Sequence, residues 1–213
     1  MAPKLWHQQS PPPSAIGAII LTFLTMKESE EVYRQLRHSW LPNRQVLWSG
    51  VQYGTAQRWA SKHGMQTLTA AMGPLMDSEN PRCHKKEKTP NAWSKYVHGA
   101  SAVFAWYIAG GDLVTVLSRP PPQRFHPSGQ TYYQVIEEPI IKGDVGNRHV
   151  NRINVAHPNA TEAVDHIYEM WPDDQCLDWK SRFGDQPTTA QWRSTGIIRL
   201  NEHPGIQNVH AEI

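Results

Sequence analysis

Two tryptophans and two adjacent carboxylates are the residues of this chain whose types best suit chemistry on a bound ligand. Trp48 and Trp93 have large flat faces that can stack on an aromatic ring or attract a cation, each contact being worth about 0.5 to 2 kcal/mol. Glu137 and Glu138 follow an aromatic segment. A buried carboxylate can stabilise the positive charge that develops on a sugar when a glycosidic bond breaks. These side chains therefore suit an aromatic ligand and a cationic transition state.

Each of these residues also has a purely structural interpretation. Trp48 by itself is more often a packing residue than a ligand platform, and so is Trp93, since helix starts often cover an aromatic side chain with a loop.

The eleven histidines include no HExxH motif and no pair three or four residues apart, so their spacing predicts no metal site. A functional interpretation therefore depends on the order of several motifs along the chain.

Four short motifs follow one another in the sequence. They are Leu47-Trp48-Ser49, Thr67-Leu68, Trp93 at the start of a long predicted helix, and an aromatic predicted strand that carries Glu137 and Glu138, with Tyr133 four residues before Glu137. In this order and spacing, the segment from Gln45 to Ile141 resembles the ADP-ribosyl cyclase and cyclic ADP-ribose hydrolase family of NAD glycohydrolases.

The resemblance implies an activity and a role for each matching residue. The chain would cleave NAD to nicotinamide and ADP-ribose, with some cyclic ADP-ribose, and would use NAD as substrate without a further cofactor. Glu137 would stabilise the ribosyl cation, and no general acid is needed because nicotinamide leaves as a neutral ring. Trp48 and Trp93 would receive the nicotinamide ring, and Ser49 would contact the phosphates. The remaining substrate-binding candidates are Thr69, Tyr132 and Tyr133.

The chain departs from the family pattern at three points. Thr69 stands where the family has a glutamate associated with the balance between cyclisation and hydrolysis, so the product ratio stays open. Gly50 stands where the family has an arginine. Cys83 and Cys176 are the only cysteines, so the disulfides typical of animal members cannot form. The resemblance is therefore to a divergent, disulfide-poor relative.

The choice between Glu137 and Glu138 depends on the local structure. The segment Thr131 to Ile141 is rich in Tyr, Val and Ile, which predicts a strand. Alternation then places Tyr133 and Glu137 on one face and Glu138 on the other, and both faces have mixed polarity. The pattern leaves both carboxylates open, and the Tyr133 spacing of the resemblance favours Glu137.

The elements that must position these residues form a helical half and an α/β half. Periodicity and stop signals predict helices over 27–37, 55–63, 92–109 and 161–171. Apolar and β-branched runs predict strands over 45–48, 112–118, 131–141 and 150–155, with a weak one over 196–200. We expect an α+β fold, with a mainly helical N-terminal lobe, an α/β C-terminal lobe containing a small, largely parallel sheet, and the active site between them.

A proline-rich flexible arm is expected over 1–14, followed by a single domain over 15–213. Its two lobes would cover about 15–110 and 111–213, with the division at Gly110-Gly111. Trp48 and Trp93 would then come from the first lobe and Glu137 from the second.

Composition narrows the class of protein further. With 213 residues, of which 39% are hydrophobic, the chain can bury a sizeable core. Its net charge of +2 gives no electrostatic signature of nucleic-acid binding.

The longest apolar run, Ala15 to Met26, is too short to span a bilayer and lacks a signal-peptide cleavage pattern. A cytoplasmic or non-classically delivered protein is expected rather than signal-peptide secretion, and no feature indicates an oligomeric state.

Two other classes of function remain open. A metal-independent ribonuclease would pair a histidine such as His98 with Glu137, although the low net charge offers little attraction for RNA. A nucleotide-binding module without turnover would keep the tryptophans, and Thr69 and Gly50 are the features that favour it.

Overall fold

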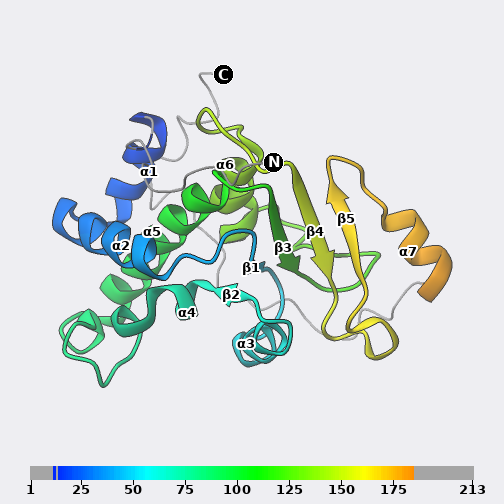
Figure 1. Cartoon of the computed structure of the whole chain (residues 1–213), viewed down its shortest axis with the longest axis horizontal. Helices are drawn as coiled ribbons and strands as arrows, with labels where there is room; N and C mark the ends of the chain where they lie inside the picture. The colour runs from blue at the N-terminus through cyan, green and yellow to red at the C-terminus, as the bar shows by residue number, and fades with distance from the viewer. Residues whose placement is uncertain (1–11, 13, 185–213) are drawn as a thin grey trace.

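A five-stranded sheet in the order β2-β1-β3-β4-β5 organises the part of the chain that the computed structural model describes, which is residue 12 and residues 14–184. The strands are β1 Gln45–Trp48, β2 Gln66–Thr67, β3 Leu113–Leu117, β4 Arg152–Ala156 and β5 Ile167–Trp171. The first four are parallel, and β5 runs antiparallel to β4 (Figure 1). The expected α+β class with a small, largely parallel sheet is confirmed.

The sheet joins the two halves of the chain. Val46 of β1 pairs with Thr67 of β2 on one side and with Thr115 of β3 on the other. Strands from both expected lobes therefore belong to one sheet. Most of the expected arm over 1–14 and the weak strand predicted over 196–200 lie outside the described residues.

Seven α-helices lie within the described residues. They are α1 Ser14–Phe23, α2 Met26–Ser39, α3 Tyr53–Lys62, α4 Leu68–Met72, α5 Pro90–Ile108, α6 Glu138–Lys142 and α7 Cys176–Phe183. Short 3-10 helices cover Gly73–Leu75, His84–Lys86 and Thr161–Ala163, and η3 Tyr133–Glu137 is a π-helix. The helices predicted over 27–37, 55–63 and 92–109 correspond to α2, α3 and α5.

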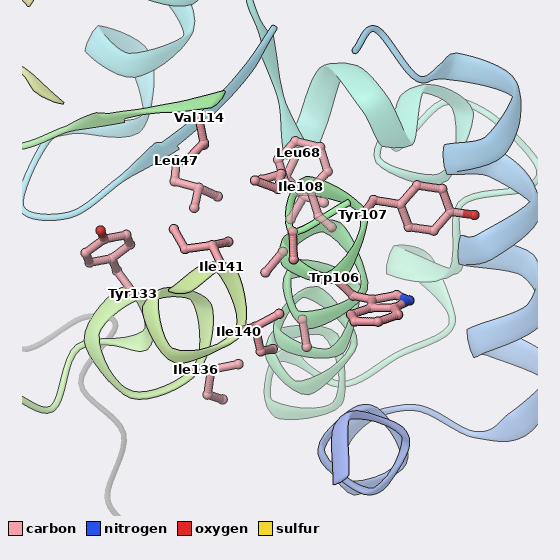
Figure 2. Packing of buried hydrophobic residues seen from close by; sticks show 14 of the residues in the cluster. Leu47, Leu68, Trp106, Tyr107, Ile108, Val114, Tyr133, Ile136, Ile140 and Ile141 are labelled. Carbon is pink, nitrogen blue, oxygen red and sulfur yellow. The ribbon is translucent and has the colours of Figure 1, made fainter. Parts of the chain in front are cut away.

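Alternating side chains on the strands separate two apolar clusters. Leu47, Val114 and Val155 belong to the larger cluster, which also contains residues of α1, α2, α5 and α6. Figure 2 shows Ile141 pointing from α6 toward Leu47, and Ile140 pointing toward α5. The smaller cluster joins Val46, Leu117 and Ala156 to α3. The helices α5 and α6 therefore cover one face of the sheet, and α3 covers the other.

The strand predicted over Thr131 to Ile141 is wrong. Tyr133–Glu137 forms the π-helix η3, which continues directly into α6. The buried residues Tyr133, Ile136, Glu137 and Ile140 recur three and four positions apart, which is helical spacing. Burial of this stripe against α5 outweighs the β propensity of Tyr, Val and Ile.

The helix predicted over Thr161 to Trp171 is also wrong. Only Thr161–Ala163 forms a helical turn, and Ile167–Trp171 is the edge strand β5. Tyr168 and Met170 are buried alternately along it, and pairing with β4 decides the structure of this short segment.

The apolar run that begins at Ala15 forms α1, which packs on α5. Ile16, Ile20 and Phe23 are buried in the larger cluster. At Gly99 of α5, an added Cβ would lie 2.3 Å from Cγ of Leu24, so the two segments are in close contact. Among the described residues, no helix is both long and apolar enough to cross a membrane.

Candidate functional site

The carboxyl ends of β1 and β3 hold the first group of candidate residues. After Trp48 the chain enters α3 on one face of the sheet, and after Leu117 it proceeds to η3 and α6 on the opposite face. In open α/β sheets, ligands bind outside the carboxyl ends of the strands where neighbouring strands send the chain to opposite faces. The β1–β3 edge, called the switch point below, is therefore a candidate binding site.

Trp48 and Ser49 both lie at the switch point. Trp48 is half-buried, and its ring meets the ring of Tyr53 edge-on, with centroids 6.4 Å apart. Tyr53 begins α3 and is 57% exposed. Ser49 is 4% exposed, and its hydroxyl has no hydrogen-bond partner among the described residues. The switch point thus offers two aromatic rings and a buried hydroxyl.

Hydrogen bonds tie the loop after β1 to the loop after β3. The backbone N–H of Ser49 donates to the carbonyl oxygen of Leu117 at 2.9 Å. Nε of Arg119 donates to the carbonyl oxygen of Gly50 at 3.4 Å. A guanidinium therefore lies beside the turn that carries Trp48 and Ser49.

Glu137 belongs to a second group, on the face covered by α5 and α6. It is the last residue of η3, whose wide turn is closed by the N–H of Glu138 donating to the carbonyl oxygen of Tyr133. Single π-helical turns are frequent at functional sites. The Glu137 side chain is 7% exposed, and Oε1 accepts a hydrogen bond from the Ser101 hydroxyl of α5.

The two adjacent carboxylates have different environments. Burial raises the pKa of Glu137 to about 7, and the hydrogen bond from Ser101 lowers it by a smaller amount. Within residues 14–184, Glu137 forms no ion pair. Glu138 instead pairs with Lys142, one helical turn later, at 2.6 Å. A buried carboxylate with a perturbed pKa is typical of a functional group, and Glu137 fits this description. Glu138 differs from Glu137 in having a cationic partner.

Tyr132 lies beside Glu137. Its hydroxyl donates to the carbonyl oxygen of His98, and its ring stacks on the His98 ring with centroids 4.4 Å apart. Phe23 of α1 meets the Tyr132 ring edge-on at 6.2 Å. Burial raises the pKa of Tyr132, and the negative charge of Glu137 raises it further. We call Glu137, Ser101, Tyr132 and His98 the Glu137 cluster.

The other predicted residues lie elsewhere. Tyr133 is 2% exposed and stacks on Phe125 within the core, with centroids 5.2 Å apart. Trp93, in the first turn of α5, is half-buried and stacks on Tyr96, with centroids 5.3 Å apart. Thr69 is half-buried in the short helix α4. The candidates therefore occupy the switch point, the Glu137 cluster, the start of α5, α4 and the core.

Sequence reasoning missed Ser101 as a partner of the catalytic candidate. It lies 36 positions before Glu137, so no local motif connects the two residues. Its one signal is a polar side chain within the continuous buried run of α5, between Ala100 and Ala102. A hydroxyl in such a run indicates a partner on a neighbouring element.

A buried polar chain joins the carboxyl ends of β3 and β4 to β5. The Ser118 hydroxyl lies 3.3 Å from Nδ1 of His157, and Nε2 of His157 lies 3.0 Å from the Tyr168 hydroxyl. Burial lowers the pKa of His157 to about 4, so its ring is neutral at neutral pH. Both Ser118 and His157 are fully buried, and their contacts link β3, β4 and β5 at this edge.

In the described part of the chain, no group of three His, Cys, Asp or Glu side chains is placed to hold a metal ion. No protein-family model matches the chain, and no curated protein matches it in sequence.

Proposed function

We propose that the chain is an NAD glycohydrolase, which breaks the bond between nicotinamide and ribose to give nicotinamide and ADP-ribose, with cyclic ADP-ribose as a further product. One observation carries the proposal: the carboxylate of Glu137 is buried without a cationic partner within residues 14–184. Burying a charge without compensation costs free energy. A ribosyl group that develops positive charge supplies that compensation in the transition state.

The electrostatics of Glu137 suit a cationic substrate. The nicotinamide ring of NAD is a pyridinium, and an adjacent positive charge favours the ionised form of a carboxyl group. Substrate binding would therefore lower the pKa of Glu137 from its value of about 7 and ionise the group when it is needed. Because the leaving ring is neutral, the reaction needs no second carboxylate as general acid.

The switch point supports binding of a dinucleotide. Trp48 and Tyr53 provide aromatic faces at the carboxyl ends of the strands, where nucleotides bind in open α/β sheets. In this proposal Trp48 contacts the nicotinamide ring and Ser49 contacts the phosphates, whereas Trp93, which stacks on Tyr96 at the start of α5, takes no part. Glu137 performs the chemical step, with Tyr132 beside it.

The test is incubation of the purified chain with NAD, with nicotinamide, ADP-ribose and cyclic ADP-ribose resolved by chromatography. Glu137→Gln should reduce nicotinamide release about 100-fold or more, because it removes the charge that stabilises the transition state. Glu138→Gln is the matched control and should stay near the wild-type rate. Near-normal turnover in Glu137→Gln contradicts the proposal, and loss in Glu138→Gln alone moves the catalytic role by one residue. Quenching of tryptophan fluorescence by NAD without nicotinamide release would instead identify a binding module.

A metal-independent ribonuclease is the second candidate function. His98 precedes Ser101 by one turn of α5 and stacks on Tyr132, so an imidazole belongs to the Glu137 cluster. An imidazole and a carboxylate can act as general acid and base on RNA. RNA degradation that is lost in His98→Ala, without nicotinamide release from NAD, would favour this candidate.

A further inference from the structure

Arg148 is a charged residue that forms no ion pair in the described part of the chain. It lies in the loop 143–151 between α6 and β4 and is half-buried. Burial lowers the pKa of its guanidinium, and no carboxylate is among the groups that oppose this effect. Arg124 is also half-buried, but its guanidinium forms two hydrogen bonds with Asp174. Arg148 therefore carries a charge that no described residue neutralises.

Two buried hydrogen-bond donors lie beside this guanidinium. Its Cζ atom is 3.7 Å from the centre of the Trp106 ring, and Trp106 is 1% exposed. The indole N–H of Trp106 and the buried hydroxyl of Tyr33 have no hydrogen-bond partner among the described residues. Burial raises the pKa of Tyr33, whereas the charge of Arg148 lowers it by a smaller amount, so this hydroxyl is close to the guanidinium. Buried polar groups nearly always have a partner, and a ligand can provide one.

The three groups come together from α2, α5 and the loop after α6. Figure 2 shows the indole nitrogen of Trp106 pointing toward α2, and the Tyr107 hydroxyl of α5 donates to the carbonyl oxygen of Tyr33 in α2 at 3.1 Å. The loop packs on the same indole, since a Cβ added at Gly146 would lie 3.6 Å from Cζ3 of Trp106. Because α5 leads into β3 and the loop leads into β4, the three groups lie at the amino ends of these strands, opposite the switch point.

We infer that Arg148, the Tyr33 hydroxyl and the Trp106 N–H bind the carboxylate of a small monocarboxylic acid. The guanidinium and the indole N–H can only donate hydrogen bonds, so the group that they lack is an acceptor. One guanidinium supplies one positive charge, which a carboxylate balances and a phosphate dianion exceeds. Two N–H groups of a guanidinium also match the two oxygens of a carboxylate.

The surroundings of these donors indicate the rest of the ligand. The indole face and the Cδ1 atom of Ile16, which would lie 2.7 Å from a Cβ at Gly146, are apolar. The acid should therefore have a short apolar body. The inference does not depend on the proposed function, because none of these residues belongs to the switch point or to the Glu137 cluster.

Titration with butyrate, followed by NMR of the indole N–H groups, tests this inference. Butyramide has nearly the same shape without the charge and is the matched control ligand. The indole signal that Trp106→Phe removes should shift as butyrate is added, with a dissociation constant in the millimolar range, and should not shift with butyramide. Arg148→Gln should weaken butyrate binding about tenfold or more, and Tyr33→Phe about fivefold. Arg152→Gln changes an exposed arginine at the start of β4 and should bind butyrate as wild type does.

Thermal unfolding gives a second readout that needs no assigned signal. A ligand that binds only the folded state raises the Tm. Butyrate should therefore raise the Tm of wild type and of Arg152→Gln more than butyramide does, and this difference should disappear in Arg148→Gln.

Three results would overturn the inference. They are no butyrate binding by wild type at millimolar concentration, equal binding of butyrate and butyramide, and equal butyrate binding by wild type and Arg148→Gln. Tighter binding of inorganic phosphate than of butyrate at Arg148 would also overturn the assignment to a carboxylate. Butyrate binding that requires Arg148 upholds the site whether or not the chain releases nicotinamide from NAD.

Discussion

The Ser101 hydroxyl donates a hydrogen bond to Oε1 of Glu137, and each of the two side chains is 7% exposed. Because the hydroxyl is neutral, it orients the carboxylate without compensating its charge. Hydrogen bonding to the ionised form lowers the pKa of Glu137, but burial raises it more. The carboxylate therefore ionises near neutral pH and keeps its charge available for a cationic partner.

The rate of nicotinamide release should depend on pH through Glu137. The reaction requires the ionised carboxylate, and the pKa of Glu137 in the free protein is about 7. We therefore expect kcat/KM for NAD to rise about tenfold per pH unit below pH 7 and to level off above it. A pH–rate profile measured from pH 5 to 9 checks this. A flat profile across that range would show that Glu137 is not the group that must ionise.

Ser101→Ala should move that pH dependence to higher pH. Loss of the hydroxyl removes the hydrogen bond that favours the ionised carboxylate, so the pKa of Glu137 rises further. At pH 6 the rate should fall about tenfold relative to wild type, with a smaller loss at pH 9. Ser101→Thr, which keeps a hydroxyl, is the control and should restore part of the rate at pH 6. A loss that is equal at all pH values would indicate a structural defect only.

Glu137→Gln should stabilise the fold above pH 7. The folded-state pKa of about 7 exceeds the ordinary value of 4.5, so the folded protein loses stability as pH rises from 4.5 to 7. This difference in pKa lowers the free energy of unfolding by about 3 kcal/mol at pH 8. A glutamine stays neutral at every pH and therefore avoids the loss. Urea unfolding at pH 5 and pH 8 measures it.

The stability that Glu137→Gln gains should become smaller toward pH 5, where the Glu137 carboxyl group of the folded wild type is mostly protonated. Glu138→Gln removes only a partly exposed pair with Lys142 and should change stability by less than about 1 kcal/mol at both pH values. Equal stability of wild type and Glu137→Gln at pH 8 would mean that water or a counter-charge reaches the carboxylate.

The local elements around the site follow from sequence patterns to different degrees. The strand at Gln45–Trp48 has the bounds predicted from its apolar run, and α5 begins two residues before the predicted start. The two-residue strand β2 at Gln66–Thr67 has no sequence signal of its own, since it exists only by pairing with β1. Strong local periodicity is therefore sufficient to predict a long helix such as α5, whereas a short strand such as β2 forms only through pairing with its partner.

The segment that carries Glu137 shows why propensity alone failed. Its helical spacing of buried residues is visible in the sequence, but Tyr, Val and Ile favour a strand, and these two signals disagree. The choice of Glu137 over Glu138 came from a motif, and the geometry of the ion pair with Lys142 supports it. The Ser101 contact and the place of Arg119 beside Gly50 required the tertiary structure, because each joins residues far apart in the chain.

Trp48→Leu should weaken substrate binding more than catalysis. If the indole stacks on the nicotinamide ring, its loss removes about 0.5 to 2 kcal/mol, which raises KM for NAD up to about 30-fold. Trp171→Leu is a matched control, since Trp171 is also half-buried but pairs with Ile153 near the start of β4. Its KM should stay within about twofold of wild type. Steady-state kinetics on both variants checks this, and equal KM values would leave Trp48 as a packing residue.

Two glycine-to-alanine changes should have opposite effects on stability. At Gly99 the new Cβ would lie 2.3 Å from Leu24, so the variant should lose about 1 to 3 kcal/mol. At Gly17, inside α1, no atom of the described residues lies within 4 Å of the added Cβ, and the variant should gain about 0.5 to 1 kcal/mol. Denaturant unfolding measures both, and a Gly99→Ala variant as stable as wild type would show that Leu24 can move aside.

The pairing of β1 with β3 affects when the switch point can form during folding. Val46 pairs with Thr115 and Trp48 with Leu117, so the ladder joins residues 69 positions apart. Such long-range pairing is slow, because the entropy of closing the intervening chain is lost before the contacts that offset it have formed. During synthesis, β1 has only β2 as a partner until β3 has emerged. We therefore expect the switch point to become ordered late in folding. A chain that ends before residue 113 contains neither this edge nor Glu137.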